Sequence, residues 1–110
     1  MKTILLRPQR DLDLKGGSLL HQKVSNLLSE GVINHCWIID MSRVKTVNNF
    51  GLMTLMAIRK MAFKHGCELY LFNLQEELEI IFEVTGFDRE FIFLENDHVL
   101  LQSNPPLVLC

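Results

Sequence analysis

The feature that most constrains the fold is the run VINHCWIIDM, residues 32–41, which is largely apolar around Trp37 and Ile39. A strand with one side facing solvent alternates apolar and polar residues, whereas a strand that is apolar on both faces is buried on both. Such strands are typically central members of parallel sheets, with helices covering both sides. The run therefore predicts an α/β fold in which residues 37–39 lie inside the sheet.

Strand-like and helix-like segments alternate along the rest of the chain. Apolar runs and period-two alternation predict further strands. They are Thr3–Leu6, the alternating RDLDL at residues 10–14, CELYLFNL at residues 67–74 and EFIFLEN at residues 90–96. Apolar residues at helical spacing predict helices between them, with KGG at residues 15–17 as a turn. These helices run from an N-cap at Ser18 to Gly31, from Phe50 to His65 before Gly66, and from an N-cap at Asn73 to Gly86.

This alternation implies parallel strands joined by right-handed crossovers. The chain is therefore predicted to be one α/β domain over residues 1–110, with a central mixed, mostly parallel sheet of four to five strands and three to four helices. Its 110 residues are 48% hydrophobic and 22% charged, as is typical of a soluble globular domain. Residues 96–110 form a tail whose structure the sequence leaves open, because Pro105 and Pro106 interrupt regular structure there.

Charge and hydropathy argue against two classes of partner. The net charge is −2 and the basic residues are scattered, so no nucleic acid partner is expected. No apolar run approaches the roughly 20 residues of a membrane span, so no direct membrane insertion is expected either. The opening MKTILLRPQRD begins like a signal peptide, but Arg7 to Asp11 interrupt it, and it is interpreted as a strand. The expected localisation is therefore cytoplasmic.

Residues able to carry out chemistry do not form a recognisable set. The sequence contains no nucleophile elbow, Walker loop, dinucleotide-binding glycine motif or HExxH zinc motif. No catalytic residue, metal site or cofactor is predicted, because the histidines fall in different segments without ligand spacing. They are His21, His35, His65 and His98.

The cysteines number three and include no CxxC pair, so neither a disulfide framework nor a zinc knuckle is indicated. Cys36 and Cys67 lie in apolar runs and are interpreted as small buried hydrophobic residues. Cys110, the last residue of the sequence, is interpreted as exposed and open to adventitious dimerisation in air.

Packing alone does not explain the residues of one stretch. TVNNFGL, residues 46–52, places two asparagines, an aromatic residue and a glycine where a helix should start. Asn48 or Asn49 can cap the first turn, and Gly51 lets another group approach the backbone closely. Val44 and Val47 are expected to point inward. Two interpretations remain open: a capped helix with a packing glycine, or a recognition site at an exposed helix start.

The motifs around this stretch resemble those of a known family. They are DMS at residues 40–42, NNFGL at residues 48–52 and TGF at residues 85–87. Their order and spacing over residues 36–94 resemble the STAS domain, the fold of bacterial anti-sigma factor antagonists and of the cytoplasmic tails of sulfate transporters. The resemblance implies a single STAS-like domain.

In the antagonists that this chain resembles, an anti-sigma kinase phosphorylates a serine that directly follows an aspartate at the helix start. On this chain Asn48 falls at the aspartate, Asn49 at the serine, Phe50 at a second hydroxyl residue and Gly51 at the glycine. Asn49 has no hydroxyl group and cannot accept phosphate. Of the neighbouring hydroxyl residues, Thr46 precedes the motif and Thr54 lies one turn into the helix, so both are weak candidates.

The resemblance supports a leading hypothesis and an alternative. The first is a non-catalytic interaction domain of the anti-sigma antagonist type in a bacterial partner-switching pathway. Its partner would be a protein, with a GHKL-type anti-sigma serine kinase as the implied class, and a homodimer stays open. Contact would be made through Asn48, Asn49, Phe50, Gly51 and Met53. The alternative is a STAS-type small-molecule sensor or an accessory subunit of a transport complex, where the family's phosphorylation site is often absent.

Overall fold

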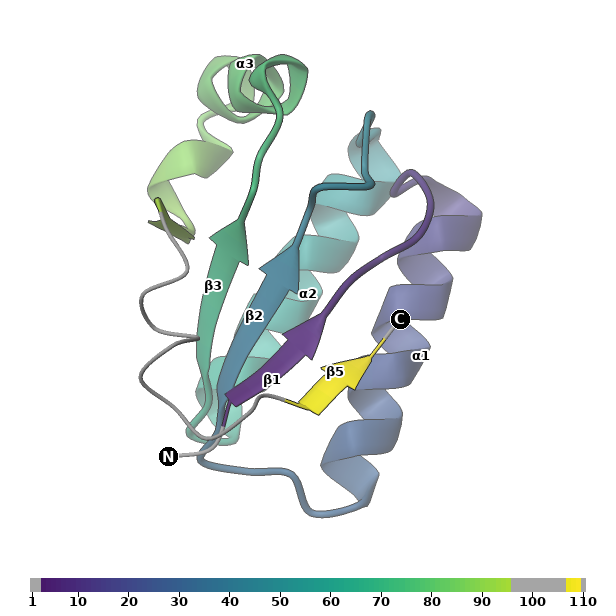
Figure 1. Ribbon diagram of the computed structural model, residues 1–110, viewed down its shortest axis with the longest axis vertical. Coiled ribbons are helices and arrows are strands. Elements are labelled where there is room, and N and C mark those ends of the chain that lie inside the picture. The colour runs from purple at the N-terminus through teal and green to yellow at the C-terminus, as the bar shows by residue number, and fades with distance from the viewer. Residues whose placement is uncertain (1–2, 96–106, 110) are drawn as a thin grey trace.

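A computed structural model describes residues 3–95 and the backbone of residues 107–109 (Figure 1). The elements in chain order are β1 (Thr3–Leu6), α1 (Leu14–Ser29), β2 (Cys36–Asp40), α2 (Asn49–Lys64), β3 (Glu68–Phe72), α3 (Glu76–Thr85), the 3-10 helix η1 (Phe87–Arg89), β4 (Ile92–Leu94) and β5 (Leu107–Leu109). Pro105 and Pro106, which the sequence predicts to interrupt the tail, lie outside the described residues.

The strands form one five-stranded sheet in the order β4-β3-β2-β1-β5. Every pairing between these strands is parallel, so the sheet is more regular than the mixed sheet predicted. β2 lies between β1 and β3, and Ile38 and Ile39 are both 0% exposed. The prediction that this run forms an interior strand is therefore confirmed.

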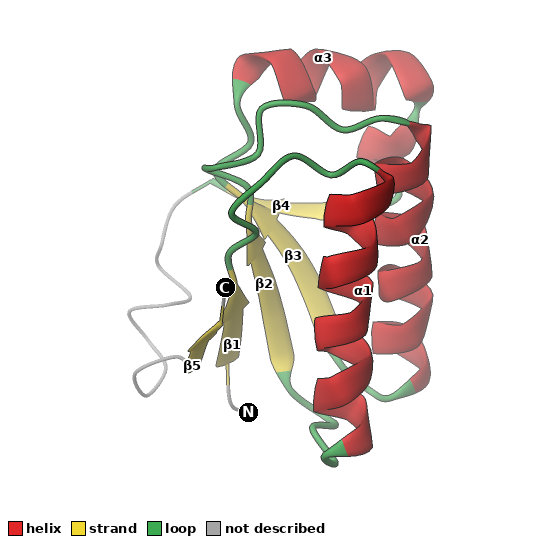
Figure 2. Cartoon of the chain, turned by 90° about the vertical axis from the view of Figure 1, so that its right-hand side faces the viewer, coloured by secondary structure: helices red, strands yellow, loops and turns green. Residues whose placement is uncertain are grey.

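The described helices pack on one face of the sheet, not on both as predicted. α1 and α2 lie side by side on that face, and α3 lies across the end of the sheet where β2 and β3 finish (Figure 2). Trp37 and Ile39 of β2 share the main core cluster with residues of all three α-helices. The reason is topological: β1 to β4 are consecutive neighbours, so each right-handed crossover falls on the same side.

The opposite face of the sheet carries a smaller apolar cluster. Leu5, Cys36 and Ile38 are buried in it, and half-buried side chains of β3 and β4 pack against them. No residue of the described helices belongs to this cluster. The apolar character of both faces of β2 is thus real, although the helices do not account for both.

The predicted strand RDLDL is wrong, and so is the predicted cap at Ser18. Helix α1 begins five residues earlier, with Asp13 as its N-cap, and the Gly16 N–H donates to Asp13 Oδ1 at 2.8 Å. Of RDLDL, Leu12 alone pairs like a strand residue, in an isolated parallel bridge to Val47. The alternating pattern was misleading because a capping carboxylate, rather than a solvent-facing strand position, explains the charge at residue 13.

The C-terminal ends of the helices agree with the sequence-based predictions better than their N-terminal starts do. Gly31, Gly66 and Gly86 all have positive φ and follow the last turns of α1, α2 and α3, as predicted. The predicted cap of α3 at Asn73 is wrong, because the N-cap is Gln75, which makes no side-chain capping bond. The Asn73 amide instead donates to Asp40. Across the described part of the chain, no helix combines the length and apolarity needed to cross a bilayer.

Candidate functional site

The loop between β2 and α2, residues 41–48, is joined by backbone hydrogen bonds to the segment that precedes α1. The Leu12 N–H donates to Thr46 O at 3.1 Å, and the Asn48 N–H donates to Leu12 O at 3.2 Å. Val44 and Val47 are buried beneath the loop, as the sequence predicts. The loop is therefore held by contacts to its own chain on its inner side and along one edge.

Asp11 strengthens the same junction. Its Oδ1 accepts hydrogen bonds from the backbone N–H groups of Lys45 at 2.8 Å and Thr46 at 3.1 Å. The bond from Lys45 is the main reason that the pKa of Asp11 lies below its usual value, since it favours the charged carboxylate. The loop thus receives a charge-assisted contact from a residue more than 30 positions earlier in the chain.

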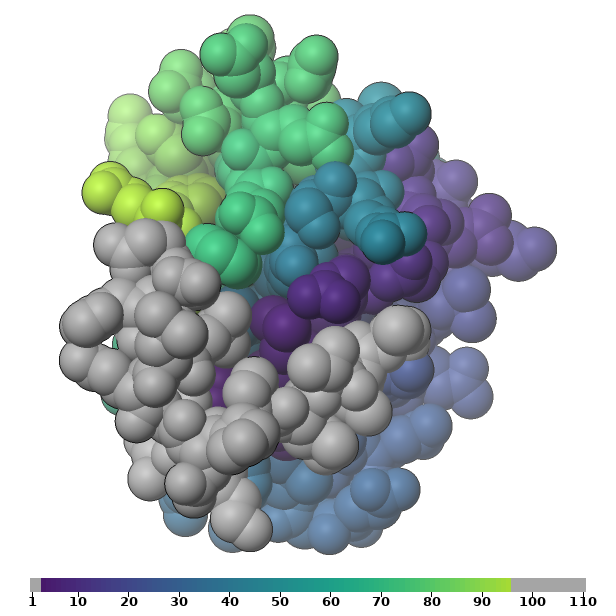
Figure 3. All heavy atoms as spheres, in the orientation of Figure 1, coloured from purple at the N-terminus to yellow at the C-terminus, as the bar shows by residue number. Residues whose placement is uncertain are grey.

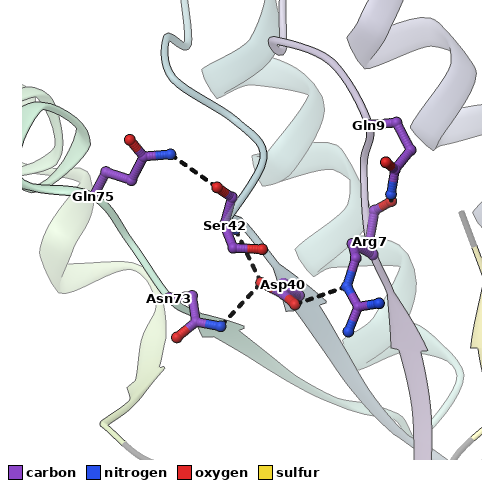
Figure 4. A network of polar contacts seen from close by, with 6 residues as sticks. All are labelled: Arg7, Gln9, Asp40, Ser42, Asn73 and Gln75. Carbon is purple, nitrogen blue, oxygen red and sulfur yellow. Dashed lines mark hydrogen bonds and ion pairs between the residues drawn. The ribbon is translucent and has the colours of Figure 1, made fainter.

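Asp40, the last residue of β2, fixes the start of the loop (Figure 4). Its side chain accepts from Arg7 Nε at 2.9 Å, from the Ser42 N–H at 2.9 Å and from Asn73 Nδ2 at 3.2 Å. Asp40 is only 4% exposed. Burial alone would raise its pKa, but the hydrogen bonds from Ser42, Arg7 and Asn73 together hold that pKa below the usual value. One carboxylate therefore ties together the ends of β1, β2 and β3.

Gln75, at the start of α3, holds the other edge of the loop. Its Nε2 donates to Ser42 O at 2.9 Å and to Val44 O at 3.2 Å. Figure 4 shows this side chain reaching toward Ser42 from the opposite side to Arg7. In the space-filling view the loop, in blue, lies between the purple chain after β1 and the green α3 (Figure 3). The loop is consequently held on both flanks.

The first turn of α2 follows directly from this rigid loop. Of the two asparagines, Asn48 is the N-cap, and its Oδ1 accepts from the Gly51 N–H at 3.0 Å. A Cβ atom on Gly51 would lie 2.0 Å from Leu12 O, closer than any real contact allows. The glycine is therefore required by the approach of the chain's own backbone, and it is buried.

The remaining residues of the predicted site reach the surface. Asn49 is the first residue of α2 and is exposed, and Phe50 and Met53 are 56% and 68% exposed. Large apolar side chains thus lie open to solvent on a helix start that is otherwise firmly anchored. Four of the five predicted contact residues share this exposed edge, and Gly51 lies under it.

Comparison with known proteins identifies the family. The family model of the STAS domain matches residues 2–99. This chain belongs to the STAS domain family. The match covers the DMS and NNFGL segments.

Two solved structures support this assignment at the level of the fold. One is the crystal structure of a Thermotoga maritima protein, TM1081, named provisionally as an anti-sigma factor antagonist. It is 21% identical, with a TM-score of 0.78, over 91% of this chain and 85% of that chain. The NMR structure of TM1081 is likewise 21% identical, with a TM-score of 0.76, over 91% of this chain and 79% of that chain.

The two threonines near the STAS motif differ in environment. Thr46 is exposed, although its backbone is bonded to both Asp11 and Leu12. Thr54 is half-buried, and its Oγ1 donates to Phe50 O at 2.9 Å. A Cβ on Gly17 would lie only 2.9 Å from that Oγ1, so Thr54 faces α1 at close range.

The sequence did not indicate several residues that position this site. The sequence pattern predicts Asp11 to be part of a strand and Asn73 to be a helix cap, and it predicts no role in the site for Arg7 or Gln75. The available signal was the polar character of Arg7 and Asn73, which follow β1 and β3 at the sheet edge where Asp40 lies. Gln75 offered no comparable signal, because its acceptors are backbone carbonyls of a distant loop.

The described residues offer little for chemistry. They contain no cluster of three or more histidine, cysteine or acidic side chains able to hold a metal ion. Cys36 and Cys67 are buried, as predicted, and burial raises the pKa of Cys36 to about 11, which keeps its thiol protonated. Cys110 lies outside the described residues.

The pKa of Asp40 predicts how stability depends on pH. Because this pKa is lowered in the folded state, Asp40 contributes stability above its unfolded value of about 3.9, and that contribution is lost as pH falls through the folded pKa. Asp40→Asn removes the titrating group, so the free energy of unfolding should fall less steeply in acid than in the wild type. At pH 7 the variant should be less stable by about 1.5–3 kcal/mol through the weakened hydrogen bonds.

Urea unfolding at a series of pH values between neutral and strongly acidic would measure both quantities. Profiles that run parallel for the two proteins would show that folding does not lower the pKa of Asp40, and profiles that coincide would show that the network around Asp40 does not stabilise the fold.

Proposed function

We propose that this STAS domain is a non-catalytic protein-interaction module of the anti-sigma factor antagonist type. In this proposal it acts in a cytoplasmic bacterial partner-switching pathway and binds a protein through Asn48, Asn49, Phe50 and Met53. The observation that carries the proposal is the exposure of Phe50 and Met53 on a helix start held by Asp11, Asp40 and Gln75.

Rigidity is what makes this exposed edge suited to binding. A contact surface that is already ordered loses little conformational freedom when a partner docks, so more of the contact energy becomes affinity. Aromatic and methionine side chains are enriched at interface centres, where a few anchors dominate the energy. Phe50 would be the anchor, with Met53 beside it and the two asparagines supplying amide contacts.

Asn49 sets how such binding would be controlled. A phosphoserine at the first turn of a helix carries a charge of about −1.5 to −2, which changes the surface that a partner meets. Asn49 stands at that place with a neutral amide, which resembles an unphosphorylated serine in charge. We infer that the domain stays in the binding-competent form and that a GHKL-type serine kinase, the implied partner, would bind it without modifying it there.

A groove elsewhere in the domain favours the alternative of a small-molecule sensor or transport accessory subunit. It lies between α3 and the ends of β3 and β4 and has a volume of about 560 Å³. Its lining includes the apolar residues Leu71, Phe82 and Phe93 and the acidic residues Glu79 and Glu83. Copurification separates the two functions: a serine kinase supports the first, and a small ligand or a transport ATPase supports the second.

The absence of a hydroxyl group on residues 48–51 gives a direct test. Incubation with ATP and a cognate anti-sigma serine kinase should leave these residues unmodified, and Asn49→Ser should accept phosphate because the motif regains its hydroxyl. Phosphopeptide mass spectrometry would locate any phosphate. Stoichiometric phosphorylation of the wild type at Thr46 or Thr54 would show that the switch is retained at another position.

Phe50→Ala tests the proposed anchor. Because Phe50 is 56% exposed, its truncation should leave the melting temperature nearly unchanged. Partner affinity should fall by roughly 30-fold or more, as expected for a hot-spot residue. Titration calorimetry with the partner and thermal unfolding measure the two effects separately.

Phe63→Ala is the matched control, since Phe63 is 85% exposed near the opposite end of the same helix and lies outside the proposed surface. This variant should bind normally. Normal binding by a folded Phe50→Ala protein would remove the start of α2 from the interface. A loss of about 3–5 kcal/mol in stability would instead assign Phe50 to the core.

A further inference from the structure

The starts of α1 and α2 share the same capping arrangement. In each, a polar N-cap accepts from the N–H of a glycine three residues later: Asp13 from Gly16 at 2.8 Å, and Asn48 from Gly51 at 3.0 Å. The residues just before the two caps, Leu12 and Val47, are partners in the parallel bridge. The two helices therefore begin side by side and run in the same direction.

Both glycines allow the same close approach. A Cβ on Gly16 would lie 2.0 Å from Asp11 O, and a Cβ on Gly51 would lie 2.0 Å from Leu12 O. The segment of residues 11–12 thus passes against the first turns of both helices. Because these contacts involve backbone atoms, the relative placement of the two helix starts is fixed by the main chain.

Exposed apolar side chains occur at both helix starts. Gly17 of α1 faces Thr54 of α2 at close range. Leu14 lies one turn before Gly17, and Phe50 lies one turn before Thr54, so these two side chains fall on neighbouring flanks of the helices at the same end. Leu14 is 61% exposed, comparable with Phe50 and Met53. We call Leu14, Phe50 and Met53 the two-helix patch.

The charges around the two-helix patch are mostly positive. The first two turns of α1 and α2 contain no carboxylate, and Lys15 lies in the first turn of α1. Three exposed cations outside the helices flank their starts: Arg10, Arg43 and Lys45. Of the carboxylates at this end, Asp11 and Asp13 accept from backbone N–H groups of the loop and of α1, and Asp40 is buried. Two helix N-termini add partial positive charge.

Building on the proposed function, we propose that the partner docks across both helix starts through a segment that combines carboxylate and apolar side chains. Leu14 and Lys15 of α1 form the second half of this interface, next to Phe50 and Met53 of α2. Apolar side chains of the partner cover the two-helix patch, and its carboxylates face Lys15 and Lys45. The partner is thereby defined by chemistry as a protein with an acidic, amphipathic docking segment.

A second copy of the chain is a poorer occupant. The acidic element of this domain is α3, which carries four glutamates and no cation. Docking α3 of one copy on the two-helix patch of another would join two different surfaces. Such head-to-tail contacts close only as rings and otherwise extend as open chains. A separate acidic partner would pair with the same cations at the helix starts without forming rings or open chains.

The test uses two synthetic amphipathic peptides of roughly 18 residues, long enough to form a helix. Both carry leucine on one face, and the polar face carries glutamate in one and lysine in the other. Titration of the labelled protein followed by NMR should show the glutamate peptide shifting amide signals at both helix starts, around Leu14–Lys15 and Asn49–Met53. The lysine peptide should bind at least tenfold more weakly.

Leu14→Ala should weaken binding of the glutamate peptide by about fivefold or more, the effect expected for an anchor worth over 1 kcal/mol. Leu19→Ala is the matched control, because Leu19 is on the same helix and is 52% exposed but lies outside the two-helix patch. It should bind normally. Melting temperatures confirm that each variant is folded.

The other outcomes are equally informative. If Phe50→Ala weakens binding and Leu14→Ala does not, the proposed function stands and the two-helix interface is wrong. If both folded variants bind normally, both proposals fail. Equal binding of the two peptides would overturn the acidic character of the partner. Concentration-dependent self-association in sedimentation velocity, abolished by Leu14→Ala, would identify a second copy as the occupant and overturn the separate partner.

Discussion

The arrangement of this STAS domain depends on the contact between residues 11–12 and the loop that precedes α2. Two backbone hydrogen bonds join Leu12 to Thr46 and Asn48, and the glycine at residue 51 allows α2 to begin directly against Leu12 O. These bonds connect segments that lie far apart in sequence, and they bring the starts of α1 and α2 to the same end of the sheet. Asp11 adds two further hydrogen bonds at the same junction. Without this junction, neither the exposed edge at Phe50 nor its neighbour Leu14 would have a fixed position.

The polar network around Asp40 supplements the junction from the sheet side. A carboxylate that is 4% exposed requires several donors to offset its desolvation, and Arg7, Ser42 and Asn73 supply them. The loop therefore leaves β2 in a defined direction before it meets Leu12. These contacts connect the fold to the proposed function, because an ordered loop presents Asn49 and Phe50 with a smaller loss of conformational entropy on binding. In the proposed function, Asn49 takes the place of a phosphorylatable serine and affects control rather than shape, since Asn48 provides the helix cap.

Most of the fold follows from local pattern, whereas the positioning contacts do not. The interior strand around Ile38 was predictable because a short run that is apolar on both faces indicates burial on both faces. The helix ends at Gly66 and Gly86 were predictable because glycine is the residue that most readily adopts positive φ. The start of α1 was not predictable, because the same sequence fits Asp13 as a helix cap and Asp13 as the polar residue of an alternating strand. The placement of helices on one face follows from strand order, which is a property of the whole chain. Asp11 and Gln75 act on backbone atoms of a distant loop, so no local pattern marks them.

Amide hydrogen exchange in the free protein tests most directly whether the start of α2 is ordered before any partner binds. The informative amides are those of Lys45, Thr46, Asn48 and Gly51, because each donates to Asp11, Leu12 or Asn48 in this arrangement. The account predicts that all four exchange far more slowly than in an unstructured peptide, with protection approaching that of the β2 amides. Exchange at these four positions as fast as in an unstructured peptide, while β2 remains protected, would contradict it. The exposed edge at Phe50 would then be ordered by the partner instead of being presented to it.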